Sequence, residues 1–352
     1  MLVGVERKSL QRKRVTSKDV AEKVGVSRTT VSLVLNNVQG IQISPETRKK
    51  VIDAAKELGY VPDATAQALV SRRTKAIGLV LTRSQHHIAT DAFLPKIISG
   101  LLSTAKKHNI RILVDWVETE HQESAYFELA RAKRIDGMIL STPRLNDNAL
   151  KALESVDIPT VMMGSISGSN LPFVDVDNVK AAEKATSYLI ELGHQDIACI
   201  SNAPPEYTAA PERAEGFRNA LSKANLPINE NLICYADFDP ESGYDRMNSL
   251  LQTGEKFTAV FVASDNVAIG AKAALRETGR HVPDDISLIG FDDIPWARYS
   301  DPPLTTIKLP AEALAQNACT LLLEFIQHGS HVNNKQIILD TELIVRKSCK
   351  PL

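Results

Sequence analysis

The chain has 352 residues, too many for one hydrophobic core of ordinary size, and this length predicts two or three domains. Its 41 lysines and arginines nearly balance 42 aspartates and glutamates, and 43% hydrophobic residues exclude a fibrous or disordered protein. No run approaches the ~20 apolar residues of a membrane span. Residues 1–14 are charged and contain no apolar run, so no signal peptide is expected. The four cysteines form no CxxC pair. We therefore expect a protein of the reducing cytoplasm, without membrane contact, disulfide framework or thiolate zinc site.

The charge is divided unevenly along the chain. Residues 1–75 contain 15 lysines and arginines against 7 acids, a local charge of +8, whereas residues 76–352 contain 26 against 35, a charge of −9. A basic head on an acidic body indicates that only the head contacts a polyanion such as DNA. Lysines that merely solubilise an N-terminal tail are the alternative.

The basic head has the sequence signals of short helices. Serine, threonine and proline stand at the expected helix starts, and glycine stands at the expected ends. These signals predict helices over residues 17–24, 28–36 and 45–58, a marginal fourth helix over 63–71, and a linker at 72–75.

The spacing of Ala21, Gly25 and Val31 is typical of a DNA-binding helix-turn-helix. A small residue lets the second helix approach the first, glycine takes the turn conformation, and a β-branched residue locks the two helices together. The start of the second helix would then reach base edges, while neighbouring hydroxyls contact phosphates. The candidate DNA contacts are Thr16, Ser17, Ser27, Arg28, Thr29, Thr30, Ser32 and Asn36. An unrelated three-helix bundle is the alternative.

Beyond residue 75, short apolar runs alternate with amphipathic helices. The predicted strands are 76–81, 110–114, 137–140, 160–163, 197–200, 232–235, 259–262 and 286–290, and the clearest helices are 93–108, 179–192 and 214–224. Alternation of this kind predicts a doubly wound parallel sheet. Because this number of strands is larger than that of an ordinary open sheet, two α/β lobes are expected.

Residues 15–36, VTSKDVAEKVGVSRTTVSLVLN, closely resemble the DNA-binding head of the LacI/GalR family of bacterial transcription regulators. Further stretches, among them ISPETRKKVIDAAKELGYVPD, ASDNVAIGA and VPDDISLIGFDDIP, extend the resemblance to about residue 348. It implies an all-α helix-turn-helix domain followed by a two-lobed α/β domain similar to periplasmic binding proteins. The expected divisions are a head at 15–62, a hinge helix and linker at 63–75, a first lobe at 76–177 with 308–330, and a second lobe at 178–307 with 331–352.

The resemblance gives residues 63–71 a role as a hinge helix. In the family, a leucine of this helix enters the minor groove of the operator and bends the duplex. Leu69 matches that leucine, and Ala66 matches the small residue one turn before it. Asp63 departs from the usual asparagine, and packing of Leu69 against the body is the alternative.

The resemblance also implies an effector site at the carboxyl ends of the strands. Arg213 and Asp292 match effector-contacting residues, and Phe238 matches an aromatic platform for a sugar ring. The loop HIATDAFLP departs from the usual family segment and supplies the first-lobe candidates. The full set is Arg83, Asp91, Arg213, Phe238, Ser264, Asp265, Asp292 and Trp296. A helix N-cap is the alternative role for Asp265.

Signals of enzyme chemistry are weak throughout the sequence. The adjacent pair His86-His87 lies near acids but lacks the spacing of a metal site, and Asp292 and Asp293 are neighbours whose side chains diverge. No Walker or GxGxxG motif supports nucleotide binding. We therefore expect no catalytic residues, no metal and no cofactor.

The sequence predicts a transcription regulator, with a repressor favoured, that binds a palindromic operator as a homodimer. Its expected small-molecule effector is a mono- or disaccharide that changes the relative orientation of the two lobes. No leucine heptads follow the strand-like segment LIVRKS, so a dimer is expected rather than a tetramer. A sugar-binding protein or sensor without specific DNA binding is the alternative.

Overall fold

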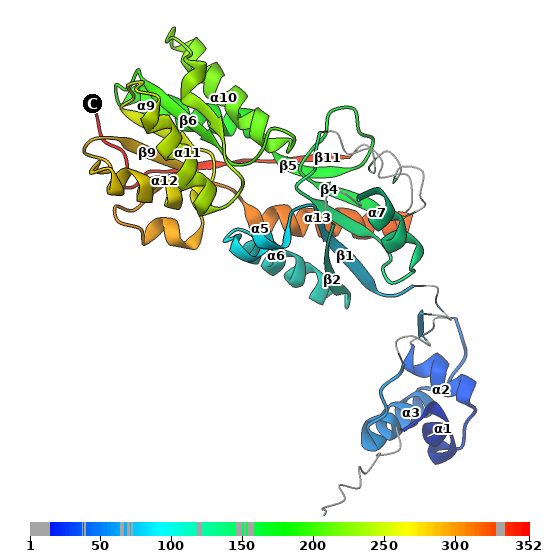
Figure 1. The fold of residues 1–352 in the computed structure, drawn as a ribbon. Coiled ribbons are helices and arrows are strands. Elements are labelled where there is room, and N and C mark those ends of the chain that lie inside the picture. Colours follow the sequence, from blue (N-terminus) through cyan, green and yellow to red (C-terminus); the bar gives the residue numbers. More distant parts are fainter. Residues whose placement is uncertain are drawn as a thin grey trace, which may run out of the picture. The chain divides into compact units, whose positions relative to one another are not determined.

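The computed structural model describes residues 15–36, 38, 40–63, 67–68, 71, 73–117, 122–145, 150, 153, 158–328 and 335–352 (Figure 1). The predicted hinge contacts Ala66 and Leu69 lie outside the described residues. The chain divides into two compact units, Met1–Thr74 and Lys75–Leu352.

The first unit is built from helices with well-formed caps. Its helices are α1 (Ser17–Val24), α2 (Arg28–Leu35) and α3 (Pro45–Leu58). The Asp19 carboxylate accepts hydrogen bonds from the main chain and the hydroxyl of Thr16. Ser27 and Ser44 cap α2 and α3 by accepting a main-chain hydrogen bond three residues on. Gly25 takes the left-handed conformation, with φ of 75°, which favours glycine.

The core of the first unit contains the residues of the helix-turn-helix pattern. Val20, Val31 and Val51 are completely buried, one from each helix, and Ala21 and Val34 are nearly so. The predicted bounds of the first and third helices are confirmed, and the second helix ends at Leu35, one residue before its predicted end. The burial of Val31 agrees with its predicted locking role.

The second unit contains two six-stranded sheets. In the first sheet every pair of neighbouring strands is parallel, in the order β11-β5-β4-β3-β1-β2. Its strands are β1 (Ala76–Leu81), β2 (Arg111–Trp116), β3 (Met138–Ser141), β4 (Thr160–Met163), β5 (Phe173–Val176) and β11 (Gln336–Leu339).

The second sheet has the order β12-β10-β9-β8-β6-β7 and is parallel except for the β10–β12 pair. Its strands are β6 (Ile197–Ser201), β7 (Ile233–Tyr235), β8 (Ala259–Val262), β9 (Ser287–Asp292), β10 (Thr305–Lys308) and β12 (Glu342–Ile344). The predicted pair of parallel α/β lobes is confirmed.

Helices cover both faces of each sheet. Alternate residues of β6 show this, because Cys199 packs in one hydrophobic cluster while Ala198 and Ile200 pack in another on the opposite face. The helices are α5 (Gln85–Thr90), α6 (Leu94–Lys107), α7 (Gln122–Arg131), α9 (Asn178–Glu191), α10 (Ala209–Lys223), α11 (Pro240–Gln252), α12 (Asp265–Glu277) and α13 (Ala311–His328). Short 3-10 helices form at Glu230–Leu232 and Pro295–Arg298. Within the described part of the chain, no helix has the length and apolar character to cross a membrane.

The chain passes between the lobes after β5, returns after β10, and passes again between β11 and β12. The prediction that residues 331–352 all belong to the second lobe is therefore wrong. Strand β11 pairs with β5 of the first sheet, because α13 packs on that sheet and delivers the following strand to its edge. Lys308, expected in the first lobe, ends β10 of the second.

Replacing Val31 with alanine is expected to lower the free energy of unfolding of the first unit by about 2 kcal/mol, because a fully buried valine loses two methyl groups. Hydrogen exchange of the full chain, followed by mass spectrometry, should show faster exchange across α1–α3. The exposed Val38→Ala variant is the control. Equal protection in Val31→Ala and wild type would refute the locking role.

Candidate functional site

The N-terminal half of α2 presents polar side chains to solvent. Arg28, Thr29 and Ser32 are exposed, while Thr30 is half-buried. Ser27 is also exposed, but its hydroxyl caps the helix and lies 2.9 Å from the Thr30 hydroxyl. Two other predicted DNA contacts lie at the start of α1, where Thr16 is the exposed N-cap and Ser17 is the half-buried first residue of the helix. This helix end therefore offers one cation and several hydroxyls to a polyanion.

Asn36 ends α2 and already has two hydrogen-bond partners. Its amide nitrogen donates to the Ser32 hydroxyl at 3.1 Å, and its amide oxygen accepts from Gln67 at 2.6 Å. Gln67 belongs to the segment predicted as the hinge helix. The described geometry thus gives Asn36 the task of tying that segment to α2.

A cavity of about 160 Å³ lies between the lobes of the second unit. It is formed where the carboxyl ends of parallel strands from both sheets face each other, the usual ligand position in such folds. Six of the eight predicted effector contacts line it: Arg83, Asp91, Arg213, Phe238, Ser264 and Asp292.

Arg213 is the central cation of this cavity and is deeply buried. Its Nε donates to the Asn178 side chain at 3.0 Å and its terminal nitrogen donates to the Ala263 carbonyl at 2.7 Å. Asp292 lies 4.0 Å from the same terminal nitrogen, and the guanidinium lies 4.0 Å from the centre of the Phe291 ring. Burial lowers the pKa of Arg213, and the surrounding carboxylates oppose that effect.

Asp292 combines an unfavourable main-chain conformation with a shifted pKa. It ends β9 with φ of 118°, and Asp293 follows with φ of 53°. The Ser264 hydroxyl donates to its carboxylate at 3.1 Å. Burial raises the pKa of Asp292 to about 6 although Arg213 opposes the shift. Strain and pKa shifts of this kind concentrate at functional sites.

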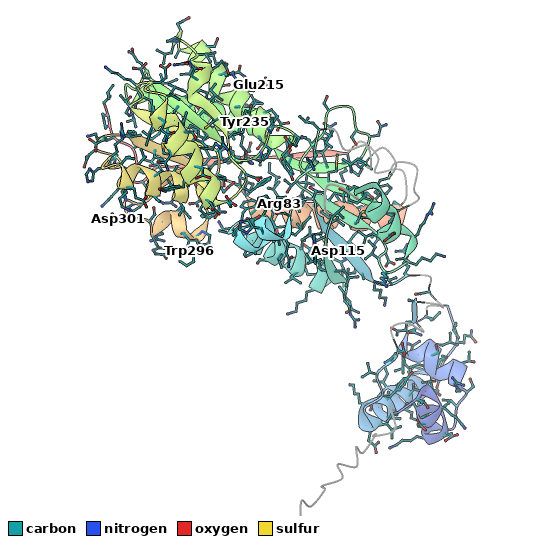
Figure 2. The ribbon with its side chains drawn as sticks, in the orientation of Figure 1. Arg83, Asp115, Glu215, Tyr235, Trp296 and Asp301 are labelled. Atoms are coloured by element: carbon teal, nitrogen blue, oxygen red, sulfur yellow. The ribbon has the colours of Figure 1, made fainter. Side chains whose placement is uncertain are left out.

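On the first-lobe side, Arg83 joins the aromatic wall of the cavity. Figure 2 shows Arg83 where the two lobes meet. Its guanidinium pairs with Asp91 at 2.5 Å and lies 5.0 Å from the centre of the Phe238 ring. Phe238 in turn contacts Tyr207 edge-on, with ring centres 4.8 Å apart. Residues of both lobes therefore form this wall of the cavity.

The structure does not bring Asp265 to the cavity. Its side chain is completely buried, and its two oxygens accept from the Ile294 main chain at 3.0 Å and the Thr306 hydroxyl at 2.7 Å. The preceding Ser264, rather than Asp265, caps α12. Burial and the nearby carboxylate of Asp292 raise the pKa of Asp265 well above its ordinary value. Asp265 holds the loop after β9, so the predicted effector contact is corrected to a structural one.

Trp296 is also absent from the cavity lining. It lies on the 3-10 helix Pro295–Arg298, is 64% exposed, and faces outward on the second lobe in Figure 2. There it lines a separate pocket with Ile269 and Tyr299. The predicted role as a second apolar wall is wrong, because the chain turns away from the cavity at Ile294.

Two histidine–aspartate contacts connect the lobes at the cavity edge. His86 of α5 lies 3.0 Å from Asp239, and His87 lies 3.4 Å from Asp237, with the two aspartates flanking Phe238. Burial raises the pKa of Asp237. No group of three or more histidine, cysteine or acidic side chains within the described residues is arranged to hold a metal ion. These histidines thus link α5 to the loop that carries Phe238.

Comparison with known proteins identifies the family. A model described as "Bacterial regulatory proteins, lacI family" matches residues 16–63, and one for a periplasmic binding protein-like domain matches residues 186–349. The regulator CelR of Thermobifida fusca is 33% identical over 96% of this chain and 99% of its own length. The repressor CytR of Escherichia coli K12 is 35% identical over 97% and 98%. The chain belongs to the LacI family of bacterial regulatory proteins. It is therefore a transcription regulator, as its motifs predicted.

Solved structures of LacI-family members have the same architecture. A lac repressor dimer bound to operator and the anti-inducer ONPF matches with a TM-score of 0.84 and 31% identity, covering 96% of this chain and all of that one. A CelR–cellobiose complex matches with a TM-score of 0.74 and 33% identity, covering 95% and 100%.

Several cavity residues of this LacI-family chain escaped the sequence analysis. Asn202 follows β6 directly, so the strand-end rule that found Asp292 could have found it too. Tyr207 and Asn266 connect the lobes by donating to the carbonyls of Thr82 at 3.2 Å and Thr90 at 3.1 Å. Their roles depend on contacts between distant segments, which no local pattern reveals. Asp175 and Asn178 also line the cavity.

Replacing Glu212 with glutamine is expected to flatten the pH dependence of stability. Burial and the neighbouring Asp175 raise the pKa of Glu212 from 4.5 to about 7, although the Asn178 amide donates to it at 3.0 Å. Because the folded state holds this proton more tightly than the unfolded state, its contribution to stability is complete below pH 4.5 and is lost as the pH rises through 7.

Thermal unfolding measured from about pH 5 to pH 8 provides the check. The midpoint of the wild type should fall more steeply with pH than that of Glu212→Gln. Parallel curves for the two proteins would show that Glu212 does not carry this proton.

Proposed function

We propose that this chain is a repressor that binds a palindromic operator as a homodimer, with a sugar between its lobes setting its affinity for DNA. It works as a regulator in the bacterial cytoplasm and not as an enzyme. The observation that carries the proposal is the exposed polar start of α2, held on a helix-turn-helix core of Val20, Val31 and Val51.

The proposed DNA contacts follow from the position of each side chain. Arg28 and Thr29 project from the first turn of α2, the part of a recognition helix that reads base edges in the major groove. Thr16 and Ser32 are placed to contact phosphates beside it. The charge of +8 over residues 1–75 adds attraction to the DNA backbone, so binding should weaken steeply with salt.

The proposed effector is a sugar because the cavity combines an aromatic wall with polar groups from both lobes. A sugar ring presents apolar C–H faces to a platform such as Phe238 and hydroxyls to carboxylates, amides and arginines. Arg83, Asn202 and Asp292 supply such groups here. The relative CelR was solved with cellobiose, which supports this ligand class.

The proposed homodimer is supported by apolar side chains that the second unit leaves in solvent. Strand β2 is the edge of the first sheet, and its Leu113, Val114 and Trp116 are exposed, as is Leu102 on the neighbouring α6. An exposed apolar edge is a ready pairing surface. The similar lac repressor was solved as a dimer on its operator, so a second copy of this chain is the proposed occupant.

A gel-shift experiment tests the DNA-binding proposal. Duplexes selected by the full chain from a randomised pool should shift at moderate salt, whereas a chain that begins at Lys75 should not shift them. Arg28→Ala should weaken binding by about 1–3 kcal/mol and relax the selected sequence at one position. Lys49→Ala, which removes an equal charge from the exposed face of α3, should weaken binding evenly across sequences. If the full and shortened chains bind these duplexes equally, the DNA-binding proposal is refuted and the alternative of a sugar-binding protein without specific DNA binding is favoured.

Replacing Val114 with aspartate should disrupt the homodimer, because it places a charge in an apolar contact. Light scattering after gel filtration should give the mass of one chain for the variant and of two for the wild type. Val345→Asp, at a comparably exposed valine of the second lobe, is the matched control. A dimeric Val114→Asp variant would place the interface elsewhere.

A further inference from the structure

The two cations that line the cavity are already neutralised. Arg83 pairs with Asp91, and Arg213 is held by Asn178, the Ala263 carbonyl and Asp292. Neither lysine nor histidine lies among the lining residues that the structure describes. The cavity therefore offers no spare positive charge to a ligand.

The acids of the cavity strengthen this restriction. Three carboxyl groups, those of Asp91, Asp175 and Asp292, line a site that contains two guanidiniums. Burial already raises the pKa of Asp175, which shows that another negative charge is unwelcome there. A phosphate or carboxylate on the ligand would lose its hydration without gaining an unpaired cation.

Two buried polar atoms of the cavity lack any partner within the described residues. They are Nε of Arg83 and the side-chain oxygen of Asn202, which belong to buried residues that are 9% and 7% exposed. An unpaired buried donor and an unpaired buried acceptor are unfavourable in the free protein. Arg83 follows β1 of the first lobe and Asn202 follows β6 of the second, so the unpaired atoms come from opposite sides of the cavity.

Phe238 contacts both residues that carry these atoms. Its main-chain nitrogen donates to the Asn202 carbonyl at 2.8 Å, and its ring lies beneath the Arg83 guanidinium. Both atoms are covered in the free protein. Once the two side chains turn toward a sugar beside Phe238, one of its hydroxyls could accept a hydrogen bond from Arg83 and another could donate to Asn202. Hydroxyl groups suit both tasks because each can donate and accept.

We infer that the effector is an uncharged sugar whose hydroxyls pair with Arg83 Nε and the Asn202 side-chain oxygen, and that the cavity rejects sugar phosphates and sugar acids. This inference rests on the proposed role of the cavity as the effector site. It assigns Asn202 as a specificity-determining residue and Asp91 as the group that keeps Arg83 from attracting anions.

The first test compares matched neutral and anionic sugars by isothermal titration calorimetry on the full chain. The pairs are cellobiose with cellobionate, maltose with maltobionate, glucose with glucose 6-phosphate, and ribose with ribose 5-phosphate. At least one uncharged sugar should bind, and its anionic counterpart should bind at least about 10-fold more weakly. If an anionic sugar binds as tightly as the neutral sugar of its pair, the inferred charge selectivity is refuted, but the proposal of a sugar effector is not. If none of these sugars binds, both the charge selectivity and the proposed sugar effector are refuted. DNA binding is tested separately by the gel-shift experiment.

The second test separates a ligand-binding role for Asn202 from a structural one. Asn202→Ala should weaken binding of the best uncharged sugar at least about 10-fold, while the ligand-free unfolding midpoint stays level or rises because an unpaired acceptor is removed. Asn317→Ala is the matched control, since Asn317 is a half-buried asparagine of α13 outside the cavity lining. A lowered midpoint with unchanged sugar affinity in Asn202→Ala would contradict the assignment.

The third test removes the carboxylate that pairs with Arg83. Asp91→Asn keeps the oxygen that accepts from the Phe93 and Leu94 main chain but removes the negative charge beside the guanidinium. The variant should bind the anionic member of the pair more tightly than the wild type does. An unchanged ratio between the neutral and anionic sugars would show that Asp91 does not set the charge selectivity.

Discussion

A guanidinium buried between two lobes must keep its partners, because a buried charge without them is strongly unfavourable. Arg213 satisfies this requirement with Asn178, the Ala263 carbonyl and Asp292. Asn178 begins α9 just after the chain enters the second lobe, and the other two partners lie at the ends of β8 and β9. The Arg213 side chain therefore holds the ends of β8 and β9 and the start of α9 in fixed positions relative to one another. These positions determine the shape of the cavity.

The same region concentrates features that cost stability. Asp292, Asp293 and Phe238 have left-handed main-chain conformations, and burial raises the pKa of Asp175 and Asp292. Two polar atoms remain unpaired in the described protein. Proteins keep such features where a ligand recovers the cost on binding. Tyr207, Asn266 and the two histidines of α5 make contacts between the lobes around the cavity, and the proposed effector would act on lobe orientation through them.

Sequence patterns predicted the head well because its signals are local. The Ala21–Gly25–Val31 spacing and the Ser27 and Ser44 caps act within a few residues, and the structure places them as expected. Strands with continuous apolar runs, such as 76–81, were also predictable. Strands β5 and β10 were not, because Asp175 and a pair of threonines interrupt their apolar pattern. Their burial comes from neighbours on the sheet, which a local pattern does not show.

The effector site was predictable only in part for a related reason. Resemblance to the family marked Arg213 and Asp292 as effector contacts, and the fold brings both to the cavity, Arg213 from α10 and Asp292 from the end of β9. It could not show that Asp265 turns inward to hold the loop after β9, or that Trp296 lies beyond the turn at Ile294. Those outcomes depend on three-dimensional packing around β9. Asn202 shows the converse, since its position after β6 was visible in the sequence but its buried, unpaired side-chain oxygen was not.

The central claim is that occupancy of the cavity and binding of the operator are energetically linked. The most direct measurement is a fluorescence-anisotropy titration of labelled operator with the full chain, with and without a saturating uncharged sugar. The account predicts that the sugar changes operator affinity by about 5- to 150-fold, the range of a coupling worth ~1–3 kcal/mol. Identical operator affinity in both titrations, with the sugar shown to be bound, would contradict it.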